Sequence, residues 1–324
     1  MKILTYLYDA DGSEKEIDLE ENILERLNDK QLLWINILER EEETIKHAVE
    51  VLHLEKVPMK GILRISERPK IFKFKEFYHF FIISVQMNEE SKLRPIPIDF
   101  LVGKNFVITV HDGDVNYLQE FARREKGEAG IGELDAESFV ATMLDLHIAS
   151  YFRVLEDIEE IVDRMDDRIL QKDMKDEEFL NKMVKLRSDV SKLRRWFLPH
   201  RDIFYALSRP DFKRIAESDS FENFQELNSH FESAVDAIES SRDTVLSLFD
   251  LFTTKSSHNM NNQIRRLTFI TLIVGGLGAI AGVWGMNFEV EYFKAAETGF
   301  WMTMIAMGLY ILSAMVIGKI LRWF

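Results

Sequence analysis

Two long runs near the C-terminal end of the chain contain no Asp, Glu, Lys or Arg. They cover residues 267–288 and 298–318. At about 1.5 Å of rise per residue, each run is long enough to cross roughly 30 Å of hydrocarbon. A buried core helix is the alternative, but such a helix rarely runs for about 20 residues without a charge on its outer face. The pattern therefore predicts two transmembrane helices, with most of the chain outside the bilayer.

A helical pattern leads into the first run without interruption. No proline or glycine occurs between Phe221 and Gly275, so the pattern predicts one helix over residues 221–284, roughly 95 Å long. Only its last third fits within a bilayer. The rest must project as a stalk, and an amphipathic stalk of that length needs neighbours to bury its apolar face. We therefore expect a homo-oligomer.

Two further amphipathic helices are expected upstream of the stalk. Apolar residues recur every three or four positions over residues 155–169, with Asp and Glu between them. The charged stretch 172–178 interrupts this pattern and is expected to turn the chain. A second helix runs through residues 186–197, and Pro199 kinks or ends it.

The first part of the chain has the pattern of a small α/β domain. Helical apolar spacing occurs over residues 42–54 and 115–124, between segments rich in β-branched and aromatic residues. Three glycines in residues 126–132 indicate a linker. The predicted strands are residues 3–8, 32–37, 71–75, 78–85, 97–102 and 106–110. The predicted domains are a cytoplasmic α/β domain (1–132), a helical region and stalk (133–266) and a transmembrane hairpin (267–324).

Basic residues indicate the orientation in the membrane. The N-terminal segment becomes charged after seven mostly apolar residues and has no cleavage-site pattern, so we do not interpret it as a signal peptide. Arg265 and Arg266 precede the first run, and Lys319 and Arg322 follow the second. By the positive-inside rule both flanks are cytoplasmic. We expect a multi-pass protein of the cell membrane with cytoplasmic N- and C-termini and only residues 285–297 outside.

Composition argues against several classes of function. The net charge of −14 argues against nucleic-acid binding. The absence of cysteine excludes thiolate metal sites and cysteine nucleophiles. The histidines are scattered, and His258, near the cytoplasmic end of the first span, is the one of interest; a tight zinc site is not expected. We find no P-loop, HExxH or GxSxG motif, so an enzyme is the weakest interpretation and no organic cofactor is expected.

The first apolar run ends in Gly285-Met286-Asn287. An asparagine beside a glycine at a helix end can cap the helix C-terminus. In a symmetric oligomer, however, one Asn per subunit would form a ring of amide oxygens that can hydrogen-bond the water shell of a hydrated cation. The amide is neutral, so it can hold a strongly hydrated ion without trapping it. The residues alone leave both interpretations open.

This tripeptide, in its context, resembles the GMN signature of the CorA family of divalent-cation (magnesium) transporters. The resemblance covers nearly the whole chain. It includes Arg68-Pro69-Lys70 before a hydrophobic strand, residues 100–111 (FLVGKNFVITVH), 193–201 (LRRWFLPHR) and 249–267, Phe300-Trp301 at the start of the second span, and a shortened basic end at 319–324.

The resemblance implies an α+β/α membrane protein that assembles as a homopentameric funnel. A cytoplasmic α/β domain would lead into a long helical stalk continuous with the pore-lining first span, with the second span outside it. Asn287 would be the filter ligand at the external mouth, Gly285 would permit a tight turn, and Met286 would support the loop by packing. The implied pore-lining positions are Asn261, Ile264, Leu267, Thr271, Gly275, Gly278 and Gly282. Among them, Ile264 and Leu267 would form a hydrophobic gate that closes by excluding water.

Some positions depart from the family pattern. Trp284 stands where Tyr usually precedes the signature, and either ring can anchor at the membrane interface. Gly276 stands where a proline is common, within a glycine-rich run that we interpret as small-residue helix packing. We expect glycine at this position to widen or loosen the pore. Arg265 and Arg266 lie beside the implied gate and are expected to face outward, because an arginine facing the axis would repel cations.

Acidic residues occur where the resemblance implies cation sites. Glu289, Glu291 and Glu297 outnumber Lys294 in the external loop and would concentrate divalent cations at the entrance, although a merely soluble loop is the alternative. Regulation by intracellular Mg²⁺ is also implied, and carboxylates suit this hard cation. The candidate regulatory ligands are Glu226, Asp250, Glu89 and Glu90, and for each of them a plain solvated residue is the alternative.

The expected function is channel-like transport of hydrated divalent cations, chiefly Mg²⁺, gated by cytoplasmic divalent ions. A divalent ion that enters at about −100 mV gains about 4.6 kcal/mol, so the membrane potential can drive transport without ATP. One alternative is a transporter of zinc, cobalt or nickel in the same superfamily. Another is a membrane-anchored oligomeric scaffold whose hairpin only holds the stalk. The expected partners are further copies of the chain and the lipid bilayer.

Overall fold

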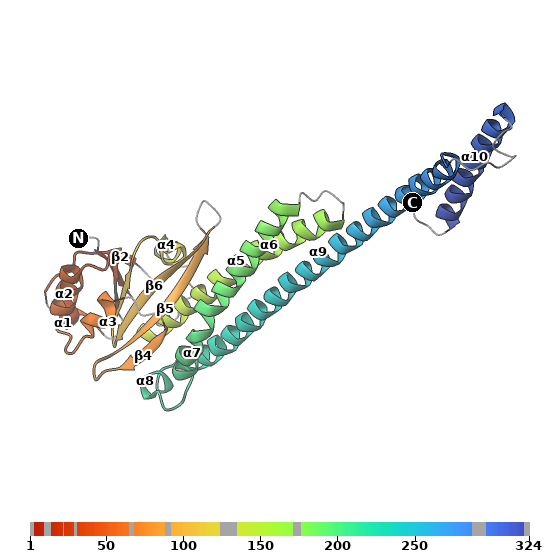
Figure 1. The fold of residues 1–324 in the computed structure, drawn as a ribbon. Helices are drawn as coiled ribbons and strands as arrows, with labels where there is room; N and C mark the ends of the chain where they lie inside the picture. Colours follow the sequence, from red (N-terminus) through yellow and green to blue (C-terminus); the bar gives the residue numbers. More distant parts are fainter. Residues whose placement is uncertain are drawn as a thin grey trace. The chain divides into compact units, whose positions relative to one another are not determined.

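The structure of the chain is a computed structural model that describes residues 3–9, 14–21, 23–28, 31–64, 68–87, 92–123, 135–170, 176–286 and 296–320 (Figure 1). The chain divides into two compact units, Met1–Leu248 and Phe249–Phe324. Each unit is described below by itself. The expected linker at 126–132 lies outside the described residues, and the domain boundaries at 132 and 266 stay predictions.

Seven strands form one sheet in the first unit. Its order is β2-β1-β3-β7-β6-β5-β4. Neighbouring strands are antiparallel except for β3 and β7, which are parallel. The strands are β1 (Ile3–Tyr8), β2 (Glu14–Glu16), β3 (Leu32–Ile37), β4 (Lys70–Lys73), β5 (Phe77–Met87), β6 (Leu93–Gly103) and β7 (Phe106–His111).

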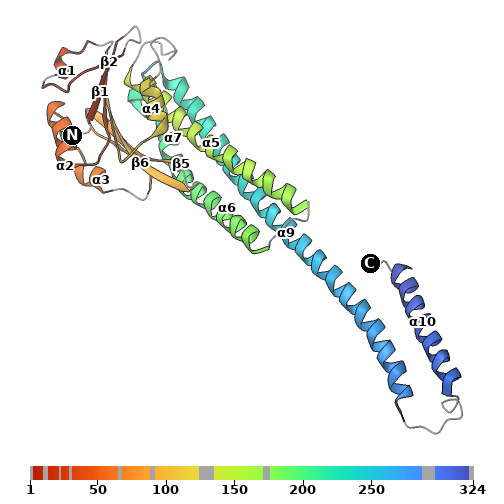
Figure 2. The same ribbon diagram turned by 90° about the horizontal axis from the view of Figure 1, so that it is seen from above.

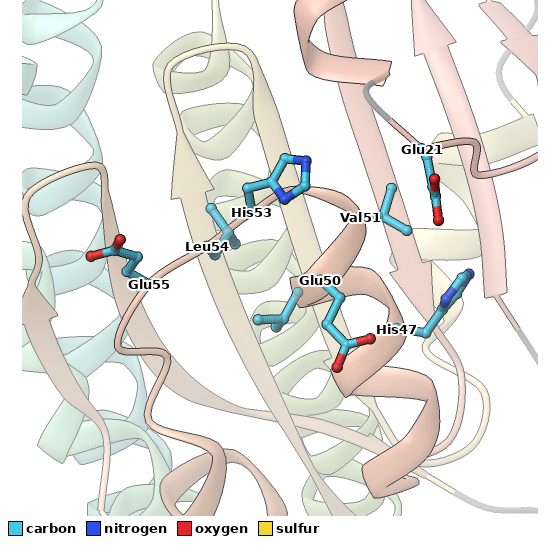
Figure 3. Close-up of a pocket in the computed structure, with 8 residues that line it drawn as sticks. Glu21, His47, Glu50, Val51, His53, Leu54 and Glu55 are labelled. Atoms are coloured by element: carbon cyan, nitrogen blue, oxygen red, sulfur yellow. The ribbon is translucent and has the colours of Figure 1, made fainter.

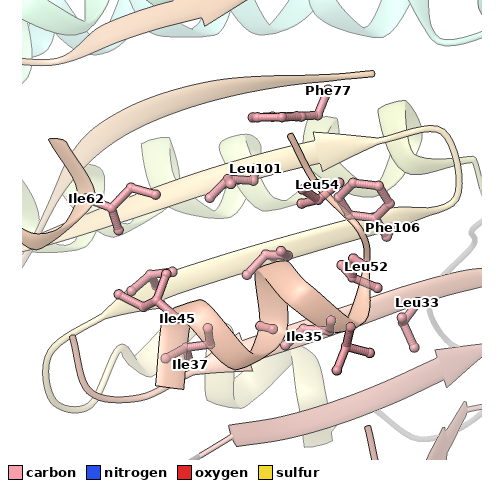
Figure 4. Packing of buried hydrophobic residues seen from close by; sticks show 14 of the residues in the cluster. Leu33, Ile35, Ile37, Ile45, Leu52, Leu54, Ile62, Phe77, Leu101 and Phe106 are labelled. Atoms are coloured by element: carbon pink, nitrogen blue, oxygen red, sulfur yellow. The ribbon is translucent and has the colours of Figure 1, made fainter. Parts of the chain in front are cut away.

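Three short helices cover one face of this sheet: α1 (Ile23–Arg26), α2 (Glu42–Val51) and α3 (Met59–Leu63). Figure 4 shows Ile45 of α2 against Ile35 and Ile37 of β3, within a cluster of buried apolar side chains. All six residues of β3 are buried. Successive strand side chains point to opposite faces, so a fully buried strand requires a second covering layer on the other face of the sheet.

That second layer is helical and aromatic. Trp34 of β3 lies against Phe121 of α4 (Asn116–Arg123) and Phe139 of α5 (Ala136–Leu170), with ring centroids 5.9 and 5.4 Å apart. The Trp34 indole N–H donates to Thr109 Oγ1 on β7 at 2.9 Å. The first unit is therefore a sheet between two helical layers, as an α/β domain requires.

β6 is longer than the predicted strand 97–102, and two prolines lie in its first half. Pro95 and Pro97 pair with Val85 and Ile83 of β5. On its other side β6 pairs with β7 only from Ile98 onward. The missing N–H groups thus fall where β6 has one neighbouring strand, which is where a strand tolerates proline.

A buried ionic cluster joins several strands at one end of the sheet. The Arg40 side chain is 4% exposed and pairs with Asp99, which is 1% exposed. The Arg40 guanidinium also donates to the carbonyls of Ile62, Pro97 and Val110, and Nε2 of His79 donates to Asp99 at 2.6 Å. The pairing offsets the cost of burying these charges and links β5, β6 and β7 to the segment after β3.

Of the remaining helices, α6 and the first part of α9 run side by side with α5 (Figures 1 and 2). α6 ends at Phe197 and is followed by a short 3₁₀ turn that contains Pro199, as the sequence predicts. Phe197 and Phe204 each stack on Phe231 of α9 with centroids 4.7 Å apart. These elements are α6 (Asp176–Phe197), η1 (Leu198–His200), α7 (Arg201–Leu207), α8 (Lys213–Ala216) and α9 (Phe221–Trp284).

α9 is the continuous 64-residue helix that the sequence predicts. It begins in the first unit and ends in the second, where α10 (Ala296–Ile320) follows it. Each helix contains an 18-residue stretch that is apolar enough to cross a membrane, with a mean hydropathy of 2.0. Of the exposed large hydrophobic side chains in the described residues, all but Phe72, Leu180, Val184 and Tyr205 lie between Leu251 and Ile320. The second unit therefore has an apolar surface suited to lipid or to other subunits.

Candidate ion pathway

The GMN tripeptide follows the last turn of α9. Gly285 N–H donates to the Ala281 carbonyl at 3.0 Å, and Met286 N–H donates to the Val283 carbonyl at 3.3 Å. Gly285 is not in the left-handed region, and an added Cβ would meet only helix carbonyls at 3.5 Å or more. Nothing in the described part of one subunit therefore requires a glycine at this position. Met286 is 53% exposed in the single chain.

Several predicted site residues lie outside the described part of the chain. They are the filter residue Asn287, the external acids Glu289 and Glu291, and the candidate regulatory acids Glu89 and Glu90.

The predicted pore-lining residues of α9 share one uncovered face. Steps of three or four positions place them in a line along the helix, and every one is exposed in the single chain. An added Cβ at three of the glycines would meet no atom within 4 Å. The line consists of Asn261, Ile264, Leu267, Thr271, Gly275, Gly278 and Gly282.

α10 covers a different face of α9. Figure 2 shows α10 beside the end of α9, and the Tyr310 hydroxyl donates to the Leu272 carbonyl at 2.8 Å. An added Cβ at Gly276 would overlap the end of the Tyr310 ring. Gly276 therefore allows the close helix approach expected of small residues. Its position against α10 does not support the expected widening of the pore.

The predicted gate residues are bare apolar side chains. Ile264 is 53% and Leu267 is 65% exposed. Arg265 and Arg266, which lie between them, are exposed as well. Each residue turns the helix by about 100°, so the arginines project from neighbouring faces rather than from the gate line itself.

A polar hollow lies on α9 before the gate residues. Its volume is about 420 Å³. The lining side chains carry hydroxyl, imidazole and amide groups, so they offer oxygen and nitrogen atoms to a hydrated ion. These residues are Thr253, Thr254, Ser257, His258 and Asn261. His258, singled out from the sequence, therefore shares this hollow with the first residue of the pore-lining line.

Two of the predicted regulatory acids are described. Glu226 is 71% exposed, and its carboxylate lies 3.7 Å from Nε2 of His230. Nδ1 of the same imidazole lies 3.2 Å from Asp145 on α5. Asp250 is exposed on α9. Among the described residues of the single chain, no group of three or more His, Asp or Glu could hold a metal ion.

Another pocket, of about 650 Å³, lies at the end of α2. Figure 3 shows His47, Glu50 and His53 spread along the helix end and the segment after it, with Glu21 and Glu55 on either side. They do not converge on one point. This agrees with the lack of a metal-binding group in the described parts of the chain.

Comparison with known proteins identifies the family. The family model described as "CorA-like Mg2+ transporter protein" matches residues 29–322, which is most of the chain. The chain belongs to this family. A cobalt/magnesium transport protein CorA of Thermotoga maritima is 24% identical over 329 residues, which cover 100% of this chain and 92% of the relative.

Solved CorA-family and related structures have the same fold. The complete structure of the CorA magnesium transporter from Methanocaldococcus jannaschii matches with a TM-score of 0.78 at 20% identity and covers 98% of both chains. The full-length CmaX protein matches with a TM-score of 0.72 at 19% identity, covering 99% of this chain and 97% of that chain. The expected fold class of α/β domain, long helix and two apolar C-terminal helices is therefore confirmed.

One residue that shapes the contact between α9 and α10 was not predicted. Tyr310 fixes which face of α9 is covered, through its contacts with Leu272 and Gly276. A tyrosine within an uncharged span was the available signal, because a hydroxyl in lipid needs a hydrogen-bond acceptor.

Proposed function

We propose that this CorA-family chain transports hydrated divalent cations, chiefly Mg²⁺, through a pore lined by several copies of α9. The observation that carries the proposal is the uncovered face of α9, which bears the gate residues Ile264 and Leu267 and a line of small side chains. Closed symmetric association is the ordinary way to bury a repeated apolar face. The family resemblance favours five subunits.

The chemistry of the line suits an ion that keeps its water. Asn287 from each subunit would ring the outer mouth with neutral amides, and Gly275, Gly278 and Gly282 would leave room for a hydration shell. Ile264 and Leu267 would close the other end by excluding water. The membrane potential would drive the ion, supplying about 4.6 kcal/mol per divalent ion at about −100 mV.

Acidic residues would concentrate and regulate the ion. Glu289 and Glu291 would raise the divalent-ion concentration at the external entrance. Cytoplasmic Mg²⁺ would bind between subunits through Glu226 and Asp250 on α9 and through Glu89 and Glu90 on the α/β domain, and would hold the pore closed. The distribution of Arg and Lys supports an orientation with both termini in the cytoplasm of a cell membrane.

Cobalt is the second ion that we propose. The Thermotoga maritima relative is named a cobalt/magnesium transport protein. A site that contacts the ion through its water shell discriminates weakly between divalent ions of similar hydrated size. Nickel and zinc belong in the same comparison.

Ion flux into proteoliposomes tests the function. The vesicles would contain a Mg²⁺-sensitive dye and carry an inside-negative potential, and Mg²⁺, Co²⁺, Ni²⁺ and Zn²⁺ would be added in turn. We expect Mg²⁺ uptake by the wild type and loss of selective uptake in Asn287→Ala. The matched control is Asn259→Ala, since Asn259 lies on α9 two residues from Asn261 and therefore off the exposed line.

Two results would count against the proposal. Flux that is equal in wild type and Asn287→Ala would remove Asn287 from the filter. No flux of any ion from a verified oligomer, with assembly intact in both variants, would favour the scaffold instead.

A further inference from the structure

Two motifs that the ion pathway does not use meet at one cleft in the first unit. Arg68-Pro69-Lys70 leads into β4, and Arg195-Trp196 lies at the end of α6. These segments, together with the prolines of β6 and the turn between α6 and α7, line a cleft of about 1030 Å³. That volume is at the upper end of the range for small-molecule sites, about 300–1,000 Å³.

The cleft is basic although the chain is acidic. Arg68, Lys70 and Arg195 line it with Asp202 as their acidic counterpart, whereas the whole chain has a net charge of −14. Arg194, next along α6, pairs with Glu239 at 2.5 Å. Lys70 and Arg195 pair with no acidic side chain in the described residues. Two cations of the cleft are therefore free to bind an anion.

The walls of the cleft are rigid and include a flat ring. Four of the six prolines of the chain line it: Pro69, Pro95, Pro97 and Pro199. Trp196 is half-buried in the lining and forms no ring contact with any described residue. Phe197, by contrast, is fully buried and packs on Tyr151 with centroids 4.3 Å apart. The core therefore uses Phe197, while the Trp196 ring remains available to a ligand.

We propose that this cleft binds a nucleoside phosphate. The guanidinium groups of Arg68 and Arg195 match phosphate oxygens in geometry, and Lys70 adds a point charge. Trp196 offers a face on which a base stacks. Asp202 can accept a hydrogen bond from a ribose hydroxyl or a base amino group. Rigid proline walls lower the entropic cost of binding. The site is separate from the α9 line and does not depend on the proposed transport.

Equilibrium binding to the purified full-length protein tests this site. Isothermal titration calorimetry in Mg²⁺-free buffer would use ATP as the probe and tripolyphosphate as the probe that lacks base and sugar. We expect one ATP per chain, at least tenfold weaker binding in Arg195→Glu, and severalfold weaker ATP binding in Trp196→Leu with tripolyphosphate binding unchanged. Arg187→Glu is the matched control, because Arg187 is exposed on α6 and does not line the cleft.

Each other outcome would overturn the proposal. No binding of ATP at millimolar concentration removes the site. Equal weakening by Arg187→Glu and Arg195→Glu means that the interaction is general attraction to charge. Equal loss of ATP and tripolyphosphate in Trp196→Leu removes the stacked base. Loss of the oligomer in Arg195→Glu, with the melting temperature of Arg187→Glu unchanged, would make the cleft a subunit contact.

Discussion

His147 is a buried imidazole in the helical layer of the first unit. It is 0% exposed, and neither ring nitrogen has a hydrogen-bond partner among the described residues. Its ring lies 5.4 Å from Tyr151 and 5.0 Å from His200, measured between centroids. Burial, and to a lesser degree His200, lowers the pKa of His147 well below its usual value. Burial also lowers the pKa of His200 to about 4, and its Nε2 accepts from Ile83 N–H.

We expect His147→Phe to raise the melting temperature at neutral pH and to weaken its fall in acid. Phenylalanine has a similar shape and removes polar atoms whose unpartnered burial costs about 1–3 kcal/mol each. A lowered pKa in the folded state favours the neutral imidazole. The contribution of this pKa shift to the stability of the folded protein is therefore complete above about pH 6.5. It is lost as the pH falls towards the folded-state pKa, and His147→Phe removes this loss.

Thermal unfolding of the full-length protein in detergent, at about pH 7 and about pH 5, measures both effects. His47→Phe is the control, because His47 is exposed on α2. Two results would contradict the prediction. One is a melting temperature of His147→Phe at about pH 7 that is below that of the wild type. The other is a fall in melting temperature from about pH 7 to about pH 5 that is as large in His147→Phe as in the wild type.

The contact between α9 and α10 depends on one glycine. An alanine Cβ at Gly276 would overlap Tyr310 and displace its hydroxyl from the Leu272 carbonyl. We expect Gly276→Ala to destabilise the hairpin by about 1–3 kcal/mol, as overpacking does. Gly278→Ala is the matched control, because its Cβ would meet no atom within 4 Å and alanine favours a helix by about 0.8–1.0 kcal/mol over glycine.

Thermal unfolding in detergent again gives the measurement, together with a double variant. In the background of Tyr310→Ala, most of the destabilisation that Gly276→Ala causes in the wild type should disappear, because the Tyr310 ring is no longer there to overlap the alanine. If Gly276→Ala and Gly278→Ala have the same melting temperature, the inference that α9 and α10 approach closely at Gly276 is wrong.

Local pattern predicts some elements well and others poorly, for physical reasons. β1, β3 and α9 have the predicted bounds, because a short run of β-branched and aromatic residues indicates a strand and a long uninterrupted helical pattern indicates a helix. β6 begins earlier than the predicted residue 97 because the single-sided pairing that tolerates Pro95 is a property of the sheet. β2, which consists of three charged residues, was not predicted. Its own sequence has no strand pattern, and its backbone pairing with β1 holds it in the sheet.

At the level of the whole molecule, sequence predicts which residues share a helix face but not what covers that face. Helical spacing, counted back from the GMN tripeptide as the family resemblance implies, placed Ile264 and Leu267 in one line. It could not show that α10 packs on the face of Gly276 and leaves that line bare, because the contact depends on Tyr310, 34 positions away in the sequence. The meeting of Arg68 and Arg195 at one cleft is hidden for the same reason: long-range packing brings them together.

If copies of α9 surround a pore, the bare apolar residues determine whether it holds water. We expect Leu267→Asn to raise basal Mg²⁺ flux severalfold or more, because a ring of amides would keep the constriction wet where a ring of leucines excludes water. Leu272→Asn is the control: Leu272 is 54% exposed but lies about 140° around the helix from Leu267, so it changes hydropathy off the pore line.

The same proteoliposome assay measures this flux, at equal protein density and after the oligomer of each variant has been verified. A leak in both variants would mean that a polar residue anywhere in the span disturbs the hairpin. A leak in neither variant would move the constriction away from Leu267. A leak in Leu267→Asn alone requires this residue to line the conducting path, and therefore requires several copies of α9 to surround that path.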